Sequence, residues 1–114
     1  MSIHWIQLES PEQLQQIRKE SATQVVMIYK HNTRCSVSST VLNRMERSSA
    51  MFGDIKVYFL DLIHHRQVSN LVEDVFAVQH ESPQLLAIKE GEVLFHLSHF
   101  EIDPGVIKRH LSKN

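Results

Sequence analysis

The chain has little of the residue types that mark several specialised classes of protein. Its 114 residues include one cysteine, three glycines and three prolines. A single cysteine cannot form an internal disulfide, so the sequence gives no sign of an oxidising, secreted setting. The chain also has no excess of charge of one sign. Its 12 Lys and Arg nearly balance its 13 Asp and Glu, and the net charge is −1. This balance excludes the basic field that nucleic-acid binding requires.

Long hydrophobic runs are missing as well. None approaches the roughly 20 residues of a membrane span, and the first residues, "MSIHWIQLES", lack the basic and apolar regions of a signal peptide. We therefore expect a cytoplasmic protein that binds neither membrane nor nucleic acid. The 42% hydrophobic and 22% charged residues are ordinary for a globular protein, and the length fits one domain over 1–114.

Hydrophobic periodicity predicts alternating helices and strands. A helix in 9–20 is expected to begin with Ser10 as cap, Pro11 at its first position and Gln13 completing a capping box. The segment around Trp5 fits either an edge strand or a tail. The other expected elements are a strand at 24–30, a helix at 35–52, a strand at 54–62, a helix at 65–76, a hairpin of strands 83–89 and 92–98 turning at Glu90-Gly91, and a final helix in 102–114 capped by Asp103.

This order predicts the fold class. A strand–helix–strand half followed by an antiparallel hairpin and a helix is the plan of the thioredoxin fold. We expect an α/β domain whose mixed sheet of four or five strands has helices on both faces. The fold by itself indicates little about chemistry.

The single cysteine, Cys35, lies where the first buried strand ends and a helix begins. The N–H groups and partial positive charge of a helix N-terminus favour a thiolate, and Arg34 adds a positive charge, so we interpret Cys35 as a nucleophile rather than an inert small residue. Ser38 stands where thioredoxins place their resolving cysteine. A mixed disulfide on Cys35 would then need an external thiol for release. Ser38 either donates a hydrogen bond to the thiolate or is a plain helix-surface serine.

Pro83 precedes the hairpin, and in thioredoxin-like folds a cis proline at this place faces the cysteine. The alternative is a trans proline that starts an edge strand. We expect the cis form, with the backbone of Ser82 available to pair with an incoming peptide or thiol.

Eight histidines raise the alternative of a metal site, with His80, His96 and His99 as the candidate ligands. Their scattered spacing is not that of a zinc site. Solvated or singly hydrogen-bonded histidines are the favoured interpretation, and we expect no metal and no bound cofactor.

Two blocks, "KHNTRCSVSS" (30–39) and "HESPQ" (80–84), with the trailing "GEVLFHLSHFEI" (91–102), resemble the monothiol bacilliredoxin (YtxJ-like) family. The resemblance implies thiol–disulfide exchange in which Cys35 removes bacillithiol, the co-substrate, from bacillithiolated proteins. Bacillithiol or a partner reductase would then reset Cys35. It also implies that Pro83 is the cis proline, with Ser82, Glu81 and His31 beside the site. Thr33 and Ser36 complete the expected substrate contacts.

The sequence departs from the family at Arg34-Cys35-Ser36, where Thr-Cys-Pro is common. The arginine is expected to lower the thiol pKa further, and the missing proline removes rigidity from the helix start. Two alternatives stay open: a general monothiol exchanger that uses another low-molecular-weight thiol, and a non-catalytic thioredoxin-fold stress or interaction protein. Glutaredoxins with Cys-Gly-Phe-Ser match less well, and nothing indicates their iron–sulfur cluster.

Overall fold

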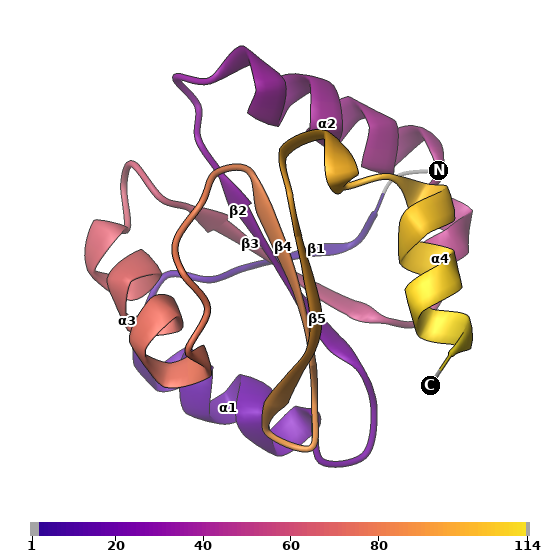
Figure 1. Cartoon of the computed structure of the whole chain (residues 1–114). Coiled ribbons are helices and arrows are strands. Elements are labelled where there is room, and N and C mark those ends of the chain that lie inside the picture. The colour runs from indigo at the N-terminus through magenta and orange to yellow at the C-terminus, as the bar shows by residue number, and fades with distance from the viewer. Residues whose placement is uncertain (1–2, 114) are drawn as a thin grey trace.

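The computed structural model describes residues 3–113, in which a five-stranded sheet is accompanied by four α-helices and two 3-10 turns (Figure 1). In chain order these are β1 (Trp5–Gln7), α1 (Glu12–Glu20), β2 (Val26–His31), α2 (Ser36–Arg47), η1 (Ser49–Phe52), β3 (Lys56–Asp61), α3 (Arg66–Phe76), β4 (Gln84–Lys89), β5 (Glu92–Ser98), η2 (His99–Glu101) and α4 (Pro104–Ser112).

The sheet is mixed, with strand order β1-β3-β2-β4-β5. Strands β1 and β2 both run parallel to β3, whereas β4 is antiparallel to β2 and to β5. The expected mixed sheet is therefore confirmed, and the segment around Trp5 is the edge strand, with Trp5 opposite Val57.

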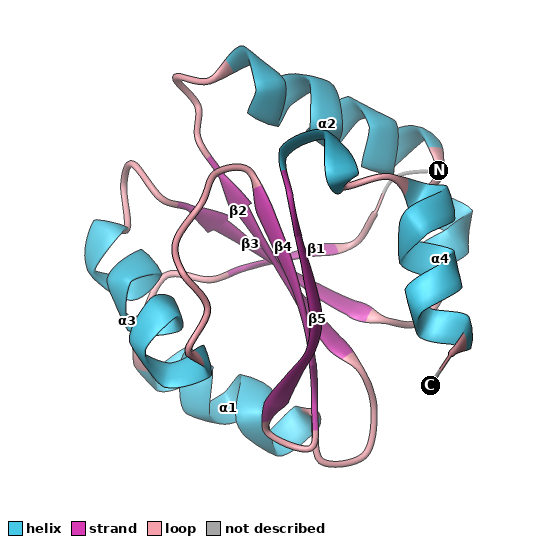
Figure 2. Ribbon diagram, in the orientation of Figure 1, coloured by secondary structure: helices cyan, strands magenta, loops and turns pink. Residues whose placement is uncertain are grey.

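Helices cover both faces of the sheet, as expected. Figure 2 shows α2 and α4 on one side and α1 and α3 on the other. Two apolar clusters fill the spaces between sheet and helices. Met27 and Tyr29 of β2 pack with Met45 of α2 on the first side, and Ile28 packs with Val72 of α3 on the second. Among residues 3–113, no helix is long and apolar enough to cross a membrane.

Strand β2 is buried along its whole length, as its continuous apolar run predicts for a central strand. Successive side chains of a strand point to opposite faces. Tyr29 and His31 therefore face α2, whereas Lys30 faces the α1 and α3 side. Both faces of this strand carry polar groups near the end that leads to Cys35.

Local signals at helix and hairpin ends are confirmed in part. The Asp103 carboxylate accepts hydrogen bonds from the N–H groups of Gly105 and Val106, so it caps α4. Glu90 and Gly91 both have positive φ, 55° and 79°, as a tight hairpin turn requires.

Two expectations about helix ends are wrong. At α1 the N-cap is Pro11 and no side chain caps the helix. The Gln13 side chain instead accepts from the N–H groups of Glu9 and Ser10, which is half of a capping box. The second helix ends at Arg47 because Ser48, with φ −114° and ψ 31°, leaves the α region, and η1 follows.

Candidate active site

Cys35 is the N-cap residue of α2, with extended backbone angles (φ −117°, ψ 119°). Its side chain is partly exposed at the end of β2. Hydrogen bonds to the sulfur from the N–H of Ser38, and then from that of Val37, lower the pKa of the thiol. The start of the helix therefore stabilises a thiolate, as the sequence position predicts.

Ser38 is fully buried, so it is not a helix-surface serine. Its hydroxyl hydrogen-bonds to the Cys35 sulfur, which also lowers the pKa of the thiol, and it accepts from the N–H of Asn32 at 3.3 Å. Burial rules out the plain helix-surface serine, and donation by the Ser38 hydroxyl to the thiolate stays a prediction. Ser38 stands three residues after Cys35, where its hydroxyl helps to lower the pKa of the thiol.

Arg34 directly precedes Cys35, and its expected effect on the thiol pKa stays a prediction. Its side chain is exposed, and the groups that lower the pKa of Cys35 are N–H and O–H groups of the helix start. The backbone N–H of Arg34 donates to the Asn32 side chain at 2.9 Å, and the N–H of Cys35 donates to the Asn32 carbonyl at 3.0 Å. Asn32 thus fixes the loop, and the guanidinium remains in solvent.

Beneath the first turn of α2 lies a polar contact that the sequence did not single out. The hydroxyl of Tyr29 donates to the carbonyl oxygen of Ser38 at 2.9 Å and lies 3.4 Å from Nδ1 of His31. His31, expected to flank the site, is only 6% exposed, and its ring contacts Phe59. The sequence offered one indication that Tyr29 makes such a contact: it lies in a buried strand, where a tyrosine hydroxyl needs a hydrogen-bond partner.

The Ser82–Pro83 peptide bond is cis, as expected. Gln84 pairs with Lys30 in the β2–β4 ladder, which places Ser82 and Pro83 at the same end of the sheet as Cys35. The carbonyl of Pro83 accepts from the N–H of His99 at 3.0 Å. Within residues 3–113, the backbone N–H and C=O of Ser82 make no hydrogen bond. They are therefore available to a bound chain.

The remaining predicted site residues lie around the cysteine without polar contacts to it. Thr33 and Ser36 flank the Cys35 turn and are exposed, as is Glu81 beside Ser82.

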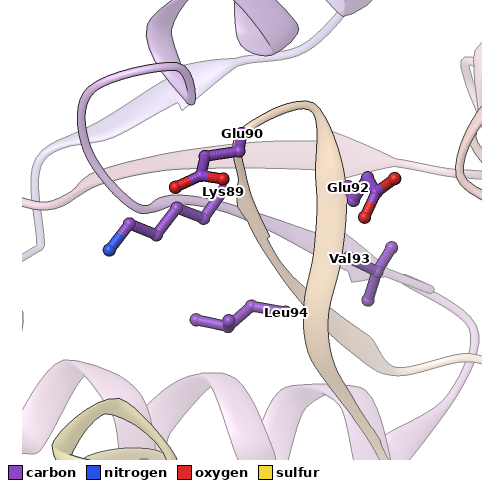
Figure 3. Close-up of a pocket in the computed structure, with 5 residues that line it drawn as sticks. All are labelled: Lys89, Glu90, Glu92, Val93 and Leu94. Carbon is purple, nitrogen blue, oxygen red and sulfur yellow. The ribbon is translucent and has the colours of Figure 1, made fainter. Parts of the chain in front are cut away.

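The histidines form no metal cluster in the described part of the chain, where no group of three His, Cys, Asp or Glu could hold an ion. His80 faces the ammonium group of Lys30 instead. A separate surface pocket is lined by residues of the β4–β5 hairpin: Lys89, Glu90, Glu92, Val93 and Leu94 (Figure 3). It lies at the turn end of β4, away from Pro83, and takes no part in the arrangement around Cys35.

Comparison with known proteins agrees with this geometry. The family model of the monothiol bacilliredoxin BrxC matches residues 6–107. A structure described as a candidate oxidoreductase with a thioredoxin fold is 24% identical, with a TM-score of 0.81 over 94% of this chain and 93% of the other. Thioredoxin from Trypanosoma brucei brucei is 17% identical, with a TM-score of 0.78 over 99% of this chain and 92% of the other.

A thioredoxin of Nicotiana alata is 16% identical, with a TM-score of 0.76 over 99% of this chain and 94% of the other. At these identities the structural likenesses establish the thioredoxin fold alone. The family match and the fold together support a role in thiol–disulfide exchange. Since the family model covers nearly the whole chain, the protein belongs to the monothiol bacilliredoxin BrxC family.

Proposed function

We propose that the protein removes bacillithiol from mixed disulfides on cytoplasmic proteins, with Cys35 as the nucleophile. The observation that carries this proposal is the state of the single thiol. The Cys35 sulfur is accessible, and the start of α2 stabilises its thiolate. A buried or unactivated thiol would have favoured the non-catalytic alternative.

The first step is an exchange of one disulfide for another. The Cys35 thiolate attacks the bacillithiol sulfur of the substrate, a new S–S bond forms, and the protein thiolate leaves and takes a proton from water. The hydrogen bonds from Val37, Ser38 and the Ser38 hydroxyl stabilise the attacking charge. No net oxidation or reduction occurs in this step, because one disulfide replaces another.

The second step needs a thiol from outside the chain. Ser38 cannot attack a disulfide, and the sequence contains no second cysteine. A free bacillithiol thiolate attacks the Cys35–bacillithiol disulfide, releases Cys35 as a thiolate and leaves as bacillithiol disulfide. A partner reductase that supplies a thiol would serve in the same way. Bacillithiol is thus a co-substrate and not a bound cofactor.

The backbone of Ser82 is the proposed docking point for the substrate. Its N–H and C=O have no partner within residues 3–113, and it lies at the Cys35 end of the sheet. An extended peptide that pairs with these two groups would hold its modified cysteine near Cys35. Exposed Thr33, Ser36 and Arg34 would border the same peptide.

Turnover with and without an external thiol tests the mechanism. A bacillithiolated test protein in several-fold excess is mixed with the reduced protein, and the release of substrate thiol is followed. We expect at most one equivalent per Cys35 without added bacillithiol and repeated turnover with it, whereas Cys35→Ser releases no more substrate thiol than bacillithiol does alone. Turnover by a Cys35→Ser variant would contradict the proposal.

A further inference from the structure

Lys30 is a buried lysine that the proposed exchange does not use. It belongs to β2, has no exposed surface and faces the side of the sheet away from Tyr29. A buried ammonium group is costly unless it has a hydrogen-bond partner. Its Nζ lies 3.2 Å from Nδ1 of His80, a residue of the connection between α3 and β4.

This connection carries Ser82 and Pro83, and side chains hold it in place. Within the described residues, positions 79–82 make no backbone–backbone hydrogen bond. The N–H of His80 donates to the Glu73 carboxylate at 2.6 Å, and the Gln84 amide donates to the carbonyl of Gln79 at 2.9 Å. The contact between Lys30 and His80 is the third of these side-chain interactions, and two of the three involve His80.

The charges around this contact favour one protonation state. Burial lowers the pKa of Lys30 to about 8, with Glu73 opposing. Burial also lowers the pKa of His80, aided by Lys30 and Arg66 and opposed by Glu73 and Glu81. Near neutral pH an ammonium group therefore donates to the unprotonated Nδ1 of a neutral imidazole. Protonation of His80 would bring two cations face to face.

We propose that Lys30 and His80 are positioning residues whose contact fixes the segment before Pro83, so that the Ser82 backbone is presented to the substrate. This inference deepens the proposed function and rests on it, because Ser82 is the proposed docking point. Neither side chain needs to touch the substrate. Their contact acts on substrate affinity, while the thiolate of Cys35 is stabilised independently from α2.

A pH dependence of KM follows from this arrangement. The contact is complete where Lys30 is charged and His80 is neutral. At acid pH His80 is protonated, so Nδ1 no longer accepts a hydrogen bond and the imidazolium repels the ammonium group of Lys30. Base removes the charge of Lys30 and weakens the hydrogen bond. We therefore expect KM to pass through a minimum near neutral pH and to rise on both sides.

The first test compares Lys30→Met with Lys108→Met, which removes an exposed lysine of α4. Methionine retains the apolar volume and removes the donor. In exchange with a bacillithiol mixed disulfide of a peptide, Lys30→Met should raise KM by about tenfold, the size expected for a lost charged hydrogen bond. Its kcat and the alkylation rate of Cys35 should stay as in the parent, and Lys108→Met should change none of the three. An unchanged KM in Lys30→Met would overturn the proposal.

The second variant, His80→Asn, offers an amide oxygen as acceptor near the place of Nδ1 but cannot titrate. It should keep the KM of the parent at neutral pH and lose the rise of KM in acid. A rise in acid that persists in His80→Asn would overturn the assignment to His80.

A readout without catalysis separates this inference from the proposed function. Amide hydrogen exchange at His80, whose N–H donates to the Glu73 carboxylate, should be faster in Lys30→Met than in Lys108→Met, because the segment loses its contact with Lys30. If the parent protein fails to exchange with any bacillithiol mixed disulfide, the proposed function fails, while faster amide exchange would still support the tie between Lys30 and this segment. Equal amide exchange in both variants would overturn it.

Discussion

The hydroxyl of Tyr29 donates a 2.9 Å hydrogen bond to the carbonyl oxygen of Ser38 and so joins the central strand of the sheet to the first turn of α2. Ser38 is also held by Asn32 and itself contacts the Cys35 sulfur. The buried strand β2 therefore helps to hold the turn of α2 that surrounds the thiolate. The first predictions concern this connection.

Replacing Tyr29 with Phe removes the hydroxyl and keeps the ring. We expect the free energy of unfolding to fall by about 1 kcal/mol, the usual net value of a buried hydrogen bond. Urea unfolding followed by the fluorescence of Trp5, the single tryptophan, measures this loss. Because the first turn of α2 is less well held, the pKa of Cys35 should also rise.

Tyr58→Phe is the matched control. Tyr58 is buried too, and its hydroxyl donates to Glu20 at 2.7 Å, on the other face of the sheet. It should lose stability without any change in the alkylation rate of Cys35. Equal alkylation rates in Tyr29→Phe and Tyr58→Phe would show that the Tyr29 contact does not reach the thiol.

Ser38→Ala removes the hydroxyl group that contacts the sulfur. The pKa of Cys35 should rise, so that alkylation by iodoacetamide at pH 7 slows by roughly two- to tenfold. Ser39→Ala, a change at the exposed neighbouring serine, should leave the rate as it is. A normal rate in Ser38→Ala would mean that the backbone N–H groups alone stabilise the thiolate.

Arg34→Gln tests the charge that the sequence had suggested. The side chain lies in solvent, where salt and water weaken its effect on a thiolate. We expect a smaller change in the alkylation rate than Ser38→Ala produces, and no change at 0.5 M salt. The measurement is the pH dependence of alkylation for both variants. An effect of Arg34→Gln larger than that of Ser38→Ala would restore the original interpretation.

Burial of Lys30 predicts a pH dependence of stability with a definite sign. The pKa falls from 10.5 in the unfolded chain to about 8 in the folded protein. Between these values the unfolded state binds more protons, so stability rises with pH. Below pH 8 the buried charge costs roughly 3 kcal/mol. Lys30→Met should therefore gain stability relative to the parent at pH 7 and lose most of this advantage by pH 10.

Urea unfolding at pH 7 and pH 10 measures the difference. Lys108→Met, which removes an exposed lysine, should differ from the parent by the same amount at both pH values. An advantage of Lys30→Met that stays constant between pH 7 and pH 10 would show that Lys30 is not a buried charge.

The sequence predicted those parts of the fold that depend on local chemistry. Asp103 caps α4 and Glu90-Gly91 forms the hairpin turn because each depends on a residue type at one position. The three-residue strand β1 stayed undecided because its pairing with β3 depends on a distant part of the chain. Helix α2 was predicted too long because nothing in its periodicity marked Ser48 as the end.

The residues of the site also fall into those that local sequence predicted and those that it did not. Cys35 at a strand–helix junction was legible from the sequence, and so was Pro83 before the hairpin. The roles of Tyr29 and Lys30 were not, because both lie in a continuous apolar run in which the partner of each polar group comes from another element. Arg34 is the converse case, because it stands out in the sequence while the groups that lower the pKa of Cys35 are N–H and O–H groups at the helix start.

Intact-mass spectrometry tests the central claim most directly. The reduced protein is mixed with a bacillithiolated test protein and, in parallel, with a glutathionylated one. We expect a bacillithiol adduct on Cys35 that is absent from Cys35→Ser, with little or no adduct from the glutathione donor. Adducts from both donors would indicate a general monothiol exchanger. No adduct from either, while Cys35 still reacts with iodoacetamide, would contradict the account.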